Sequence, residues 1–260
     1  NSPFWNLKDK KVKNMEAVLT QLITMDEINK MEYNKINERI NTAFTYDDFA
    51  WQKDRKIRIS YPDRAKGLHK VLYQCPRCHT QYRMMSEGSK LWCDKCKKEW
   101  DMSEYGEVSA VNGKTEFSHI PDWYEWQREQ VRKEIESGMY RFESEVTVDS
   151  LPNAKGFIHL GKGKLTHDMN GFLLEGEYEG SPYSVPFNAK SLYSCHIEYN
   201  YLGKKGDCVD LNTLTDTYYI YPKCEYFSVT KIALATEEIY KMWRTRIPAV
   251  ISACQGGFAT

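Results

Sequence analysis

Two C-x-x-C pairs, "CPRC" at 75–78 and "CDKC" at 93–96, constrain this chain more than any other feature of its sequence. About fourteen residues separate the pairs, which is one short of the usual four-cysteine zinc spacing and close enough to keep that interpretation. Two such tight turns at the ends of a short hairpin supply a tetrahedral set of thiolates. We therefore predict a zinc ribbon in which Zn²⁺ is bound by Cys75, Cys78, Cys93 and Cys96.

The segment between the pairs fits a hairpin. "TQYRMM" and "KLWC" predict strands, "SEGS" predicts the turn, and Trp92 and Trp100 are expected to pack over the small core. Four thiolates close the coordination shell and leave no position for water, so the predicted metal is structural. Two alternatives stay open: a pair of redox dithiols, although no helix pattern follows either pair, and His79 replacing one cysteine as a ligand.

Composition places the chain among ordinary globular proteins. It has 260 residues, 41% of them hydrophobic and 28% charged, for which two domains are a fair expectation. No run approaches the roughly 18 apolar residues of a membrane-spanning helix. Without a secretory signal, the eight cysteines are expected to be reduced thiols or metal ligands. Because the first residue is Asn1, not Met, we expect a piece of a longer protein.

Charge is balanced in total but not along the chain. The formal net charge is +0, yet residues 53–98 hold about thirteen basic and four acidic residues. Such a concentration indicates an anionic partner, either nucleic acid or a membrane surface. Basic residues beside the cysteines have another role available, since a zinc ion with four thiolates carries a formal charge of about minus two. Because of this role and the neutral total, we do not expect nucleic acid as the partner.

Local signals divide the N-terminal part. "MEAVLTQLIT" at 15–24 predicts a strand, with one helix face as the alternative. Thr24 and Glu27 form a capping box, which predicts one or two helices from about 25 to 44. Asp47 and Asp48 are adjacent carboxylates, interpreted as caps of a short helix that runs through Trp51.

A long helix and a β-rich region follow the cysteines. Residues 121–138 predict a helix with Asp122 as N-cap and Gly138 as its stop. From about residue 140 to 231, turn residues separate short β-rich runs, after which "ATEEIYKMWRTR" predicts a helix. The predicted strands are "YRFESEVTVDSL", "FIHLGKGKLTHD", "GFLLEGEYEG", "SPYSVPF", "YSCHIEYNYL", "DCVDLN", "DTYYIYP" and "YFSVTKI".

About seven antiparallel strands closed by one C-terminal helix is the order of a pleckstrin-homology-like barrel. We therefore predict an α+β fold with a four-cysteine zinc ribbon, a helical linker and a pleckstrin-homology-like antiparallel β domain with a C-terminal helix. The expected boundaries are a strand and helices at 1–52, the ribbon with its basic lead-in at 53–106, a linker and amphipathic helix at 107–138, and the β-rich domain at 139–260.

No residue pattern indicates an active site. His167 and Asp168 lie at a predicted turn and are interpreted as surface polar residues, and "GKGK" at 161–164 lacks the spacing of a phosphate loop. His196 follows Cys195, but neighbours on a strand point to opposite faces, so they cannot pair directly. The remaining cysteines have no paired spacing and are interpreted as buried free thiols: Cys195, Cys208, Cys224 and Cys254.

Several longer phrases carry a resemblance: "YDDFAWQ", "DRAKGLHKVLYQCPRC", "GSKLWCDKCKKEW", "EFSHIPDWYEWQREQVRKEI" and "LTHDMNGF". From about Phe44 onward, the chain resembles the region that follows the catalytic domain in bacterial 1-acyl-glycerol-3-phosphate acyltransferase family proteins. The resemblance implies that residues 1–52 are the remnant tail of an acyltransferase domain. It also implies phospholipid synthesis, a cytoplasmic location peripheral to the inner face of the membrane, and the acyltransferase domain of the parent chain as partner.

The family's catalytic motif is absent from this chain. Acyl transfer in the family uses a H-x-x-x-x-D pair, in which His acts as base and Asp orients it. None of the six histidines has Asp five residues later, and His119 with Asp122 is the nearest miss. We therefore expect an accessory or regulatory module that is inactive alone and binds a partner or an anionic membrane, with a nucleic-acid-binding zinc ribbon as the alternative. The histidines tested are His69, His79, His119, His159, His167 and His196.

Overall fold

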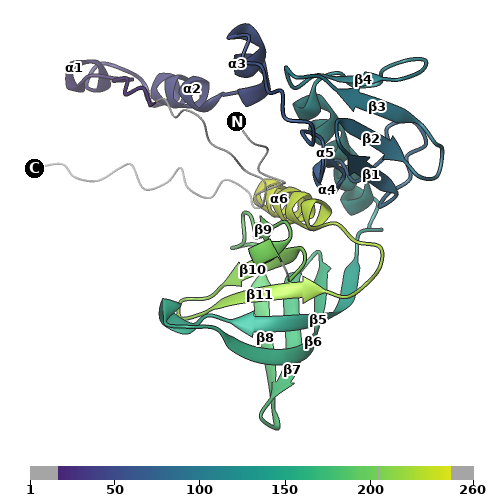
Figure 1. The fold of residues 1–260 in the computed structure, drawn as a ribbon. Coiled ribbons are helices and arrows are strands. Elements are labelled where there is room, and N and C mark those ends of the chain that lie inside the picture. Colours follow the sequence, from purple (N-terminus) through teal and green to yellow (C-terminus); the bar gives the residue numbers. More distant parts are fainter. Residues whose placement is uncertain (1–16, 204, 247–260) are drawn as a thin grey trace, which may run out of the picture.

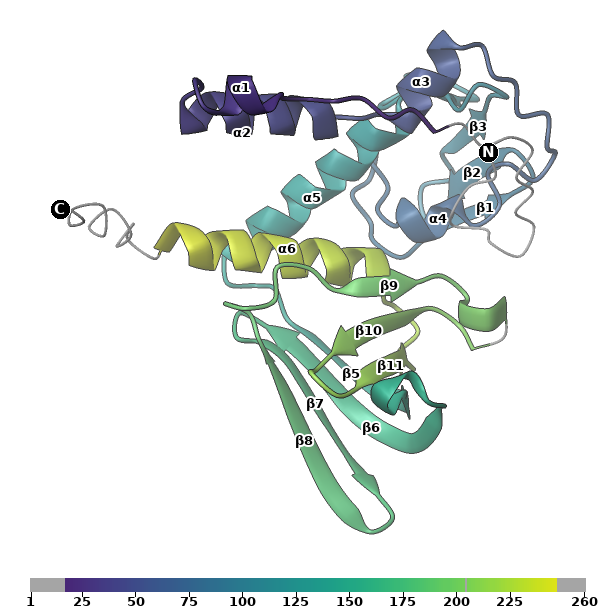
Figure 2. The ribbon, with the colours of Figure 1, turned by 90° about the vertical axis from the view of Figure 1, so that its left-hand side faces the viewer.

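The computed structural model describes residues 17–203 and 205–246. In this part the fold is α+β, with two antiparallel sheets and six α-helices (Figure 1). The helix α6 lies between the two sheets in both views (Figure 2), while α1 and α2 extend away from them. The predicted α+β fold class is therefore confirmed.

Three helices form the N-terminal part: α1 (Met25–Ile28), α2 (Tyr33–Phe44) and α3 (Asp48–Asp54). The predicted capping box is present, since Thr24 and Glu27 each cap the other's backbone. Asp47 is also confirmed as a cap, because its side chain accepts from the backbone N–H groups of Phe49 and Ala50. The strand expected at 15–24 is wrong for residues 17–24, which form no strand, and residues 15 and 16 lie outside the described part.

The ribbon is larger than the sequence predicts. Its sheet has the order β1-β2-β3-β4, preceded by the short helix α4. Glu87 pairs with Lys90 across a two-residue turn in which Gly88 has φ of 58°, a conformation that favours glycine. Trp100 is fully buried, whereas Trp92 is only half-buried. The sheet continues past residue 106, where the sequence placed a linker; the elements are α4 (Leu68–Val71), β1 (Met84–Glu87), β2 (Lys90–Cys93), β3 (Glu99–Met102) and β4 (Val108–Ala110).

Helix α5 (Ile120–Glu136) packs against this ribbon. Trp123 is fully buried against Trp100, with ring centroids 5.1 Å apart. The residue at the N-cap is His119, and Asp122 lies inside the first turn, so the predicted cap is wrong. Pro121 explains the shift, since proline is favoured at the first helical positions.

Gln127 of α5 is fully buried, although its polar character places it on the solvent side of the helix in the sequence. Its amide donates to the carbonyl of Val71, and its carbonyl accepts from the backbone N–H of Gln74, both at 3.0 Å. Buried backbone groups need such partners. Gln127 therefore fastens α5 to the segment that enters the first cysteine pair.

The second sheet has seven antiparallel strands in the order β8-β7-β6-β5-β11-β10-β9. Seven of the eight predicted runs contain these strands, but "YFSVTKI" instead contains the start of α6 (Val229–Arg246). There Val229 and Ile232 are both buried against the sheet, as helical spacing requires. The strands are β5 (Phe142–Ser150), β6 (Ile158–Asp168), β7 (Gly171–Tyr178), β8 (Ser181–Asn188), β9 (His196–Glu198), β10 (Cys208–Asn212) and β11 (Thr217–Pro222).

Helix α6 joins the two halves of the described chain. One part of it packs on the inner face of the seven-stranded sheet. Leu234, Ala235 and Ile239 pack in a separate cluster with Val131 and Ile135 of α5. The ribbon and the β domain therefore share an apolar interface and are not linked by chain alone.

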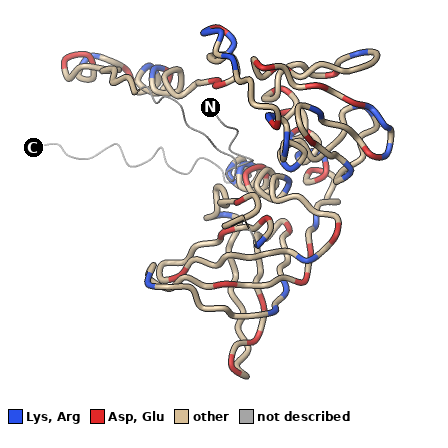
Figure 3. The backbone as a smooth tube through the Cα atoms, viewed as in Figure 1, with Lys and Arg blue, Asp and Glu red and all other residues tan. Residues whose placement is uncertain are grey.

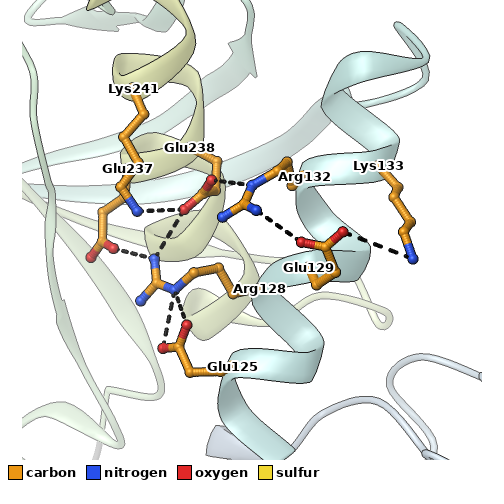
Figure 4. A network of polar contacts seen from close by, with 8 residues as sticks. All are labelled: Glu125, Arg128, Glu129, Arg132, Lys133, Glu237, Glu238 and Lys241. Carbon is orange, nitrogen blue, oxygen red and sulfur yellow. Dashed lines mark hydrogen bonds and ion pairs between the residues drawn. The ribbon is translucent and has the colours of Figure 1, made fainter.

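Charged side chains border this interface (Figure 4). The carboxylate of Glu238 on α6 is almost completely buried and accepts from Arg132 Nε at 2.8 Å and from Lys241 Nζ at 2.7 Å. Arg128 on α5 pairs with Glu238 at 3.4 Å and also with Glu237. Although burial raises the pKa of Glu238, the hydrogen bonds from Arg132 and Lys241 hold it below its usual value.

His167 is buried, which contradicts its interpretation as a surface residue. It lies in β6, where its ring stacks on Phe172 with centroids 3.7 Å apart and its Nδ1 lies 2.9 Å from the hydroxyl of Tyr140. The turn residues that follow it in the sequence suggested exposure. Aromatic side chains from β7 and from the segment between α5 and β5 cover it instead.

Burial of neutral histidines predicts acid sensitivity. Burial lowers the pKa of His167 to about 3 and that of His69 to about 4, against about 6.5 in an unfolded chain. The unfolded state therefore takes up protons first, so this stability is complete above about pH 6.5 and is lost as pH falls toward the folded values. We expect the free energy of unfolding in urea to fall from pH 7.5 to pH 5, by up to about 1.4 kcal/mol per histidine and pH unit.

The variant His167→Phe isolates the contribution of His167 to this pH dependence of stability. Phenylalanine keeps the stacking on Phe172 but cannot be protonated. The free energy of unfolding should therefore fall less between pH 7.5 and pH 5 than it does in the parent chain. Acid release of metal affects both chains equally and cancels in the comparison. The same pH dependence in both chains would show that His167 does not contribute.

Candidate metal centre

The two cysteine pairs have the same backbone conformation. In each, the residue after the second cysteine donates its N–H to the carbonyl of the first, His79 to Cys75 and Lys97 to Cys93, both at 2.9 Å. His79 and Lys97 have φ of 59° and 58°, which non-glycine residues adopt infrequently. Two matching turns therefore aim two pairs of sulfurs at one point.

The four sulfurs form a compact cluster. Sγ of Cys75 lies 3.7 Å from Sγ of Cys96, and Sγ of Cys78 lies 3.7 Å from Sγ of Cys93. All four sulfurs lie within 4.8 Å of one another. A zinc ion with four sulfurs at about 2.3 Å requires tetrahedral edges of about 3.8 Å, whereas a disulfide requires about 2.05 Å. The cluster therefore has the dimensions of a tetrahedral metal site and contains free thiols.

Local contacts shift the pKa values of the cysteine ligands in different directions. Burial raises the pKa of Cys75 and of Cys93. Burial opposes ionisation at Cys78 as well, but hydrogen bonds with Thr80 lower its pKa to about 6. Several thiolates this close repel one another unless a cation compensates their charge. Metal binding here would therefore release protons.

The alternative ligand His79 does not join the sulfur cluster. It is exposed, and its ring lies edge-on against Trp126 with centroids 5.4 Å apart. Lys98, expected to neutralise the metal site, is buried and donates through Nζ to the carbonyls of Asn112 and Lys114 at 2.6 and 2.8 Å. This lysine fastens the loop after β4 to the ribbon.

Much of the basic lead-in is engaged within the chain. Arg58 pairs with Glu104, and Lys53 pairs with Glu107 at 2.7 Å. Nε of Arg64 donates to the carbonyl of a ribbon residue. Basic and acidic positions are interspersed along the ribbon and the β domain (Figure 3). These contacts leave fewer charges of the lead-in for an anionic partner than the sequence alone suggests.

The scattered cysteines lie apart from the metal centre. Cys208 is buried, and Cys195 and Cys224 are half-buried. Sγ of Cys195 lies 3.4 Å from the hydroxyl of Thr236 on α6, and burial raises its pKa to about 12. Cys195 precedes β9, which begins at His196, and the His196 side chain lies with Glu198 and Asp210 instead. Cys254 lies outside the described residues.

The structure pairs His119 with Asp47, not with Asp122. Nε2 of His119 lies 2.6 Å from Oδ2 of Asp47, across 72 positions of sequence. The other oxygen of Asp47 already caps α3. The pair therefore ties α3 to the start of α5. The sequence could not reveal it, because the two residues meet only through the tertiary fold.

Comparison of the chain with protein-family models, with curated proteins and with solved structures gave no match. Within residues 17–203 and 205–246, no helix is long and apolar enough to cross a bilayer. The function must therefore be argued from the residues and their geometry.

Proposed function

We propose that this chain is a non-catalytic accessory module of an acyltransferase, folded by a structural zinc ion and docked through its N-terminal helices. The observation that carries the proposal is the exposure of residues 17–46. None of these residues is buried in the described structure. They form an arm, yet they present large exposed apolar side chains: Val18, Leu19, Leu22, Met25, Ile28, Tyr33, Phe44 and Tyr46.

Zinc suits the sulfur cluster better than other metals. Tetrahedral sites of four thiolates select zinc or iron–sulfur chemistry, and zinc is the usual ion where the thiolates come from two C-x-x-C turns. A shell of four thiolates leaves no open position for substrate or water. The metal therefore supports the fold and does not take part in a reaction.

The arm needs a partner to hold its shape. Helix α2 has 12 residues, a length at which isolated helices are marginal in water. A shallow groove between α2 and the preceding segment is lined by Leu22, Met31 and Ala43, among others. Exposed apolar surface of this extent marks interaction sites.

The charge of the arm favours a protein over a membrane. Residues 17–46 carry about four acidic and three basic residues, whereas membrane-surface helices have polar faces rich in Lys and Arg. The resemblance to acyltransferase family proteins makes the acyltransferase domain the partner of choice. We further propose that the β domain is pleckstrin-homology-like, supported by its seven antiparallel strands and the helix packed on them.

A binding measurement with an acyltransferase domain of that family tests the docking. We expect the variant Tyr33→Asp/Phe44→Asp to weaken binding at least about tenfold, because it places charge in a desolvated apolar contact. Both residues are more than two-thirds exposed in this chain, so the fold should survive. The matched control, Asn34→Asp/Asn41→Asp, adds the same charge to the same helix outside the apolar stripe and should bind normally.

Three results would overturn the proposal. The first is equal binding by both variants, and the second is binding to anionic vesicles or duplex DNA with no binding to the acyltransferase domain. The third is turnover of lysophosphatidate and an acyl donor by this chain alone.

A further inference from the structure

A second set of metal-ligating side chains lies at the edge of the seven-stranded sheet, far from the cysteines in sequence. His196 and Glu198 are two residues apart on β9 and so share a face, and Asp210 on β10 pairs directly with His196. Nε2 of His196 lies 3.2 Å from Oε1 of Glu198 and 3.9 Å from Oδ2 of Asp210. One ligand atom from each lies within 4.8 Å of the other two.

Burial of the Asp210 carboxylate is a second, independent sign of a ligand at this edge. Its residue is 5% exposed, and buried carboxylates are normally paired or bind a metal. Among the described residues, its Oδ1 lies 3.3 Å from Sγ of Cys208, and the nearest cationic group to Oδ2 is the imidazole of His196 at 3.9 Å. In the part of the chain that the structure describes, the buried carboxylate therefore has His196 as a partner and no lysine or arginine.

Another buried carboxylate in the same sheet has its negative charge compensated by basic side chains. Asp149 on β5 is equally buried, at 4% exposed. It pairs with Lys205 Nζ at 2.5 Å and with His159 Nδ1 at 2.8 Å. Register places Asp149 and Asp210 on either side of Tyr219 in one row across the strands. Among the described residues, Asp149 thus has a lysine and a histidine as partners, whereas Asp210 has a histidine and no lysine or arginine.

We propose that His196, Glu198 and Asp210 bind a divalent transition-metal ion. One imidazole nitrogen and two carboxylate oxygens suit Zn²⁺ or Mn²⁺, and two carboxylates neutralise the charge of the ion. Ligand distances of about 2.0–2.2 Å place ligand atoms roughly 3.0–3.6 Å apart, and the separations of His196 from Glu198 and Asp210, 3.2 and 3.9 Å, are close to this range. The His196 side chain is 64% exposed, which gives the ion a route from solvent and leaves positions for water.

The site differs from the cysteine cluster in what it selects. Thiolates favour zinc, whereas a nitrogen and two oxygens also accept Mn²⁺, which has low affinity for sulfur sites that already hold zinc. Mn²⁺ therefore serves as a probe of this site alone. The sequence interpretation treated His196 only as the neighbour of Cys195, because its pairing with Asp210 depends on strand register.

Titration with Mn²⁺ of the full chain loaded with one equivalent of Zn²⁺, which the cysteine cluster takes up, followed by electron paramagnetic resonance, tests the proposal. We expect one Mn²⁺ per chain, with affinity reduced by about 10–100-fold or more in His196→Gln and in Asp210→Asn, since even outer-shell groups contribute that much. The control His159→Gln removes an exposed histidine from the same sheet and should leave binding unchanged.

His196 is exposed, so its variant should fold even if Asp210→Asn does not, and ribbon zinc content should be the same in all four chains. No Mn²⁺ binding, unchanged affinity in His196→Gln, or an equal loss in His159→Gln would overturn the site. Each of these outcomes is independent of whether the N-terminal arm docks on a partner.

Discussion

Replacing Cys93 with serine is expected to abolish stoichiometric metal binding by the cysteine cluster and to unfold the ribbon. Cys93 is fully buried, and its backbone is part of β2 as well as of the second turn. A structural zinc ion contributes about 10–16 kcal/mol of folding free energy, which is as large as the whole stability of a typical domain. Metal content after gel filtration and near-ultraviolet circular dichroism, which reports the buried Trp100, measure both effects.

Removing the metal with a chelator should have the same effect as the substitution. Cys224→Ser is the matched control, because Cys224 is a half-buried free thiol outside the cluster. It should keep the metal and the spectrum of the parent chain. A Cys93→Ser protein with full metal content and an unchanged spectrum would contradict a folding role for the metal.

The second large loss of stability is expected when the ion pairs between α5 and α6 are removed. In the double variant Arg128→Ala/Arg132→Ala, Lys241 is the one cationic partner that the buried carboxylate of Glu238 keeps among the described residues. Removing partners from a buried ion pair costs up to about 3–5 kcal/mol when the charge is left without compensation, and Lys241 retains part of that compensation here. We expect a loss of this size in urea unfolding, together with separate transitions for the ribbon and the β domain.

Lys133→Ala provides the control on the same helix. Its side chain is 61% exposed and pairs with Glu129 at 3.9 Å, so its removal should change stability by less than about 0.5 kcal/mol. If the double variant costs no more than this control, the network of Figure 4 does not hold the two halves together.

Features determined by neighbouring residues could be predicted from the sequence. The cysteine turns, the capping box at Thr24 and the cap at Asp47 depend on groups within a few positions of each other, and all are present. The strands from β5 to β8 are long, and turn residues separate them, so their pattern is also readable. The predicted ribbon hairpin is present for the same reason, although β1 starts later than expected.

Features set by tertiary contacts could not be predicted. Val229 and Ile232 belong to a run rich in β-favouring residues, yet burial on one face makes that run helical. Gln127 and His167 are polar residues that the sequence places at the surface, and distant partners bury them. His196 meets Asp210 only through the register of β9 and β10.

X-ray absorption at the zinc edge tests most directly the central claim that the cysteine cluster is a closed structural site. It is best made on the His196→Gln variant, so that only the cysteine cluster contributes. We predict one zinc ion per chain, with four sulfur ligands at about 2.3 Å and no nitrogen or oxygen ligand. A shell with oxygen or nitrogen in place of a sulfur, or far less than one zinc per chain under reducing conditions, would contradict it.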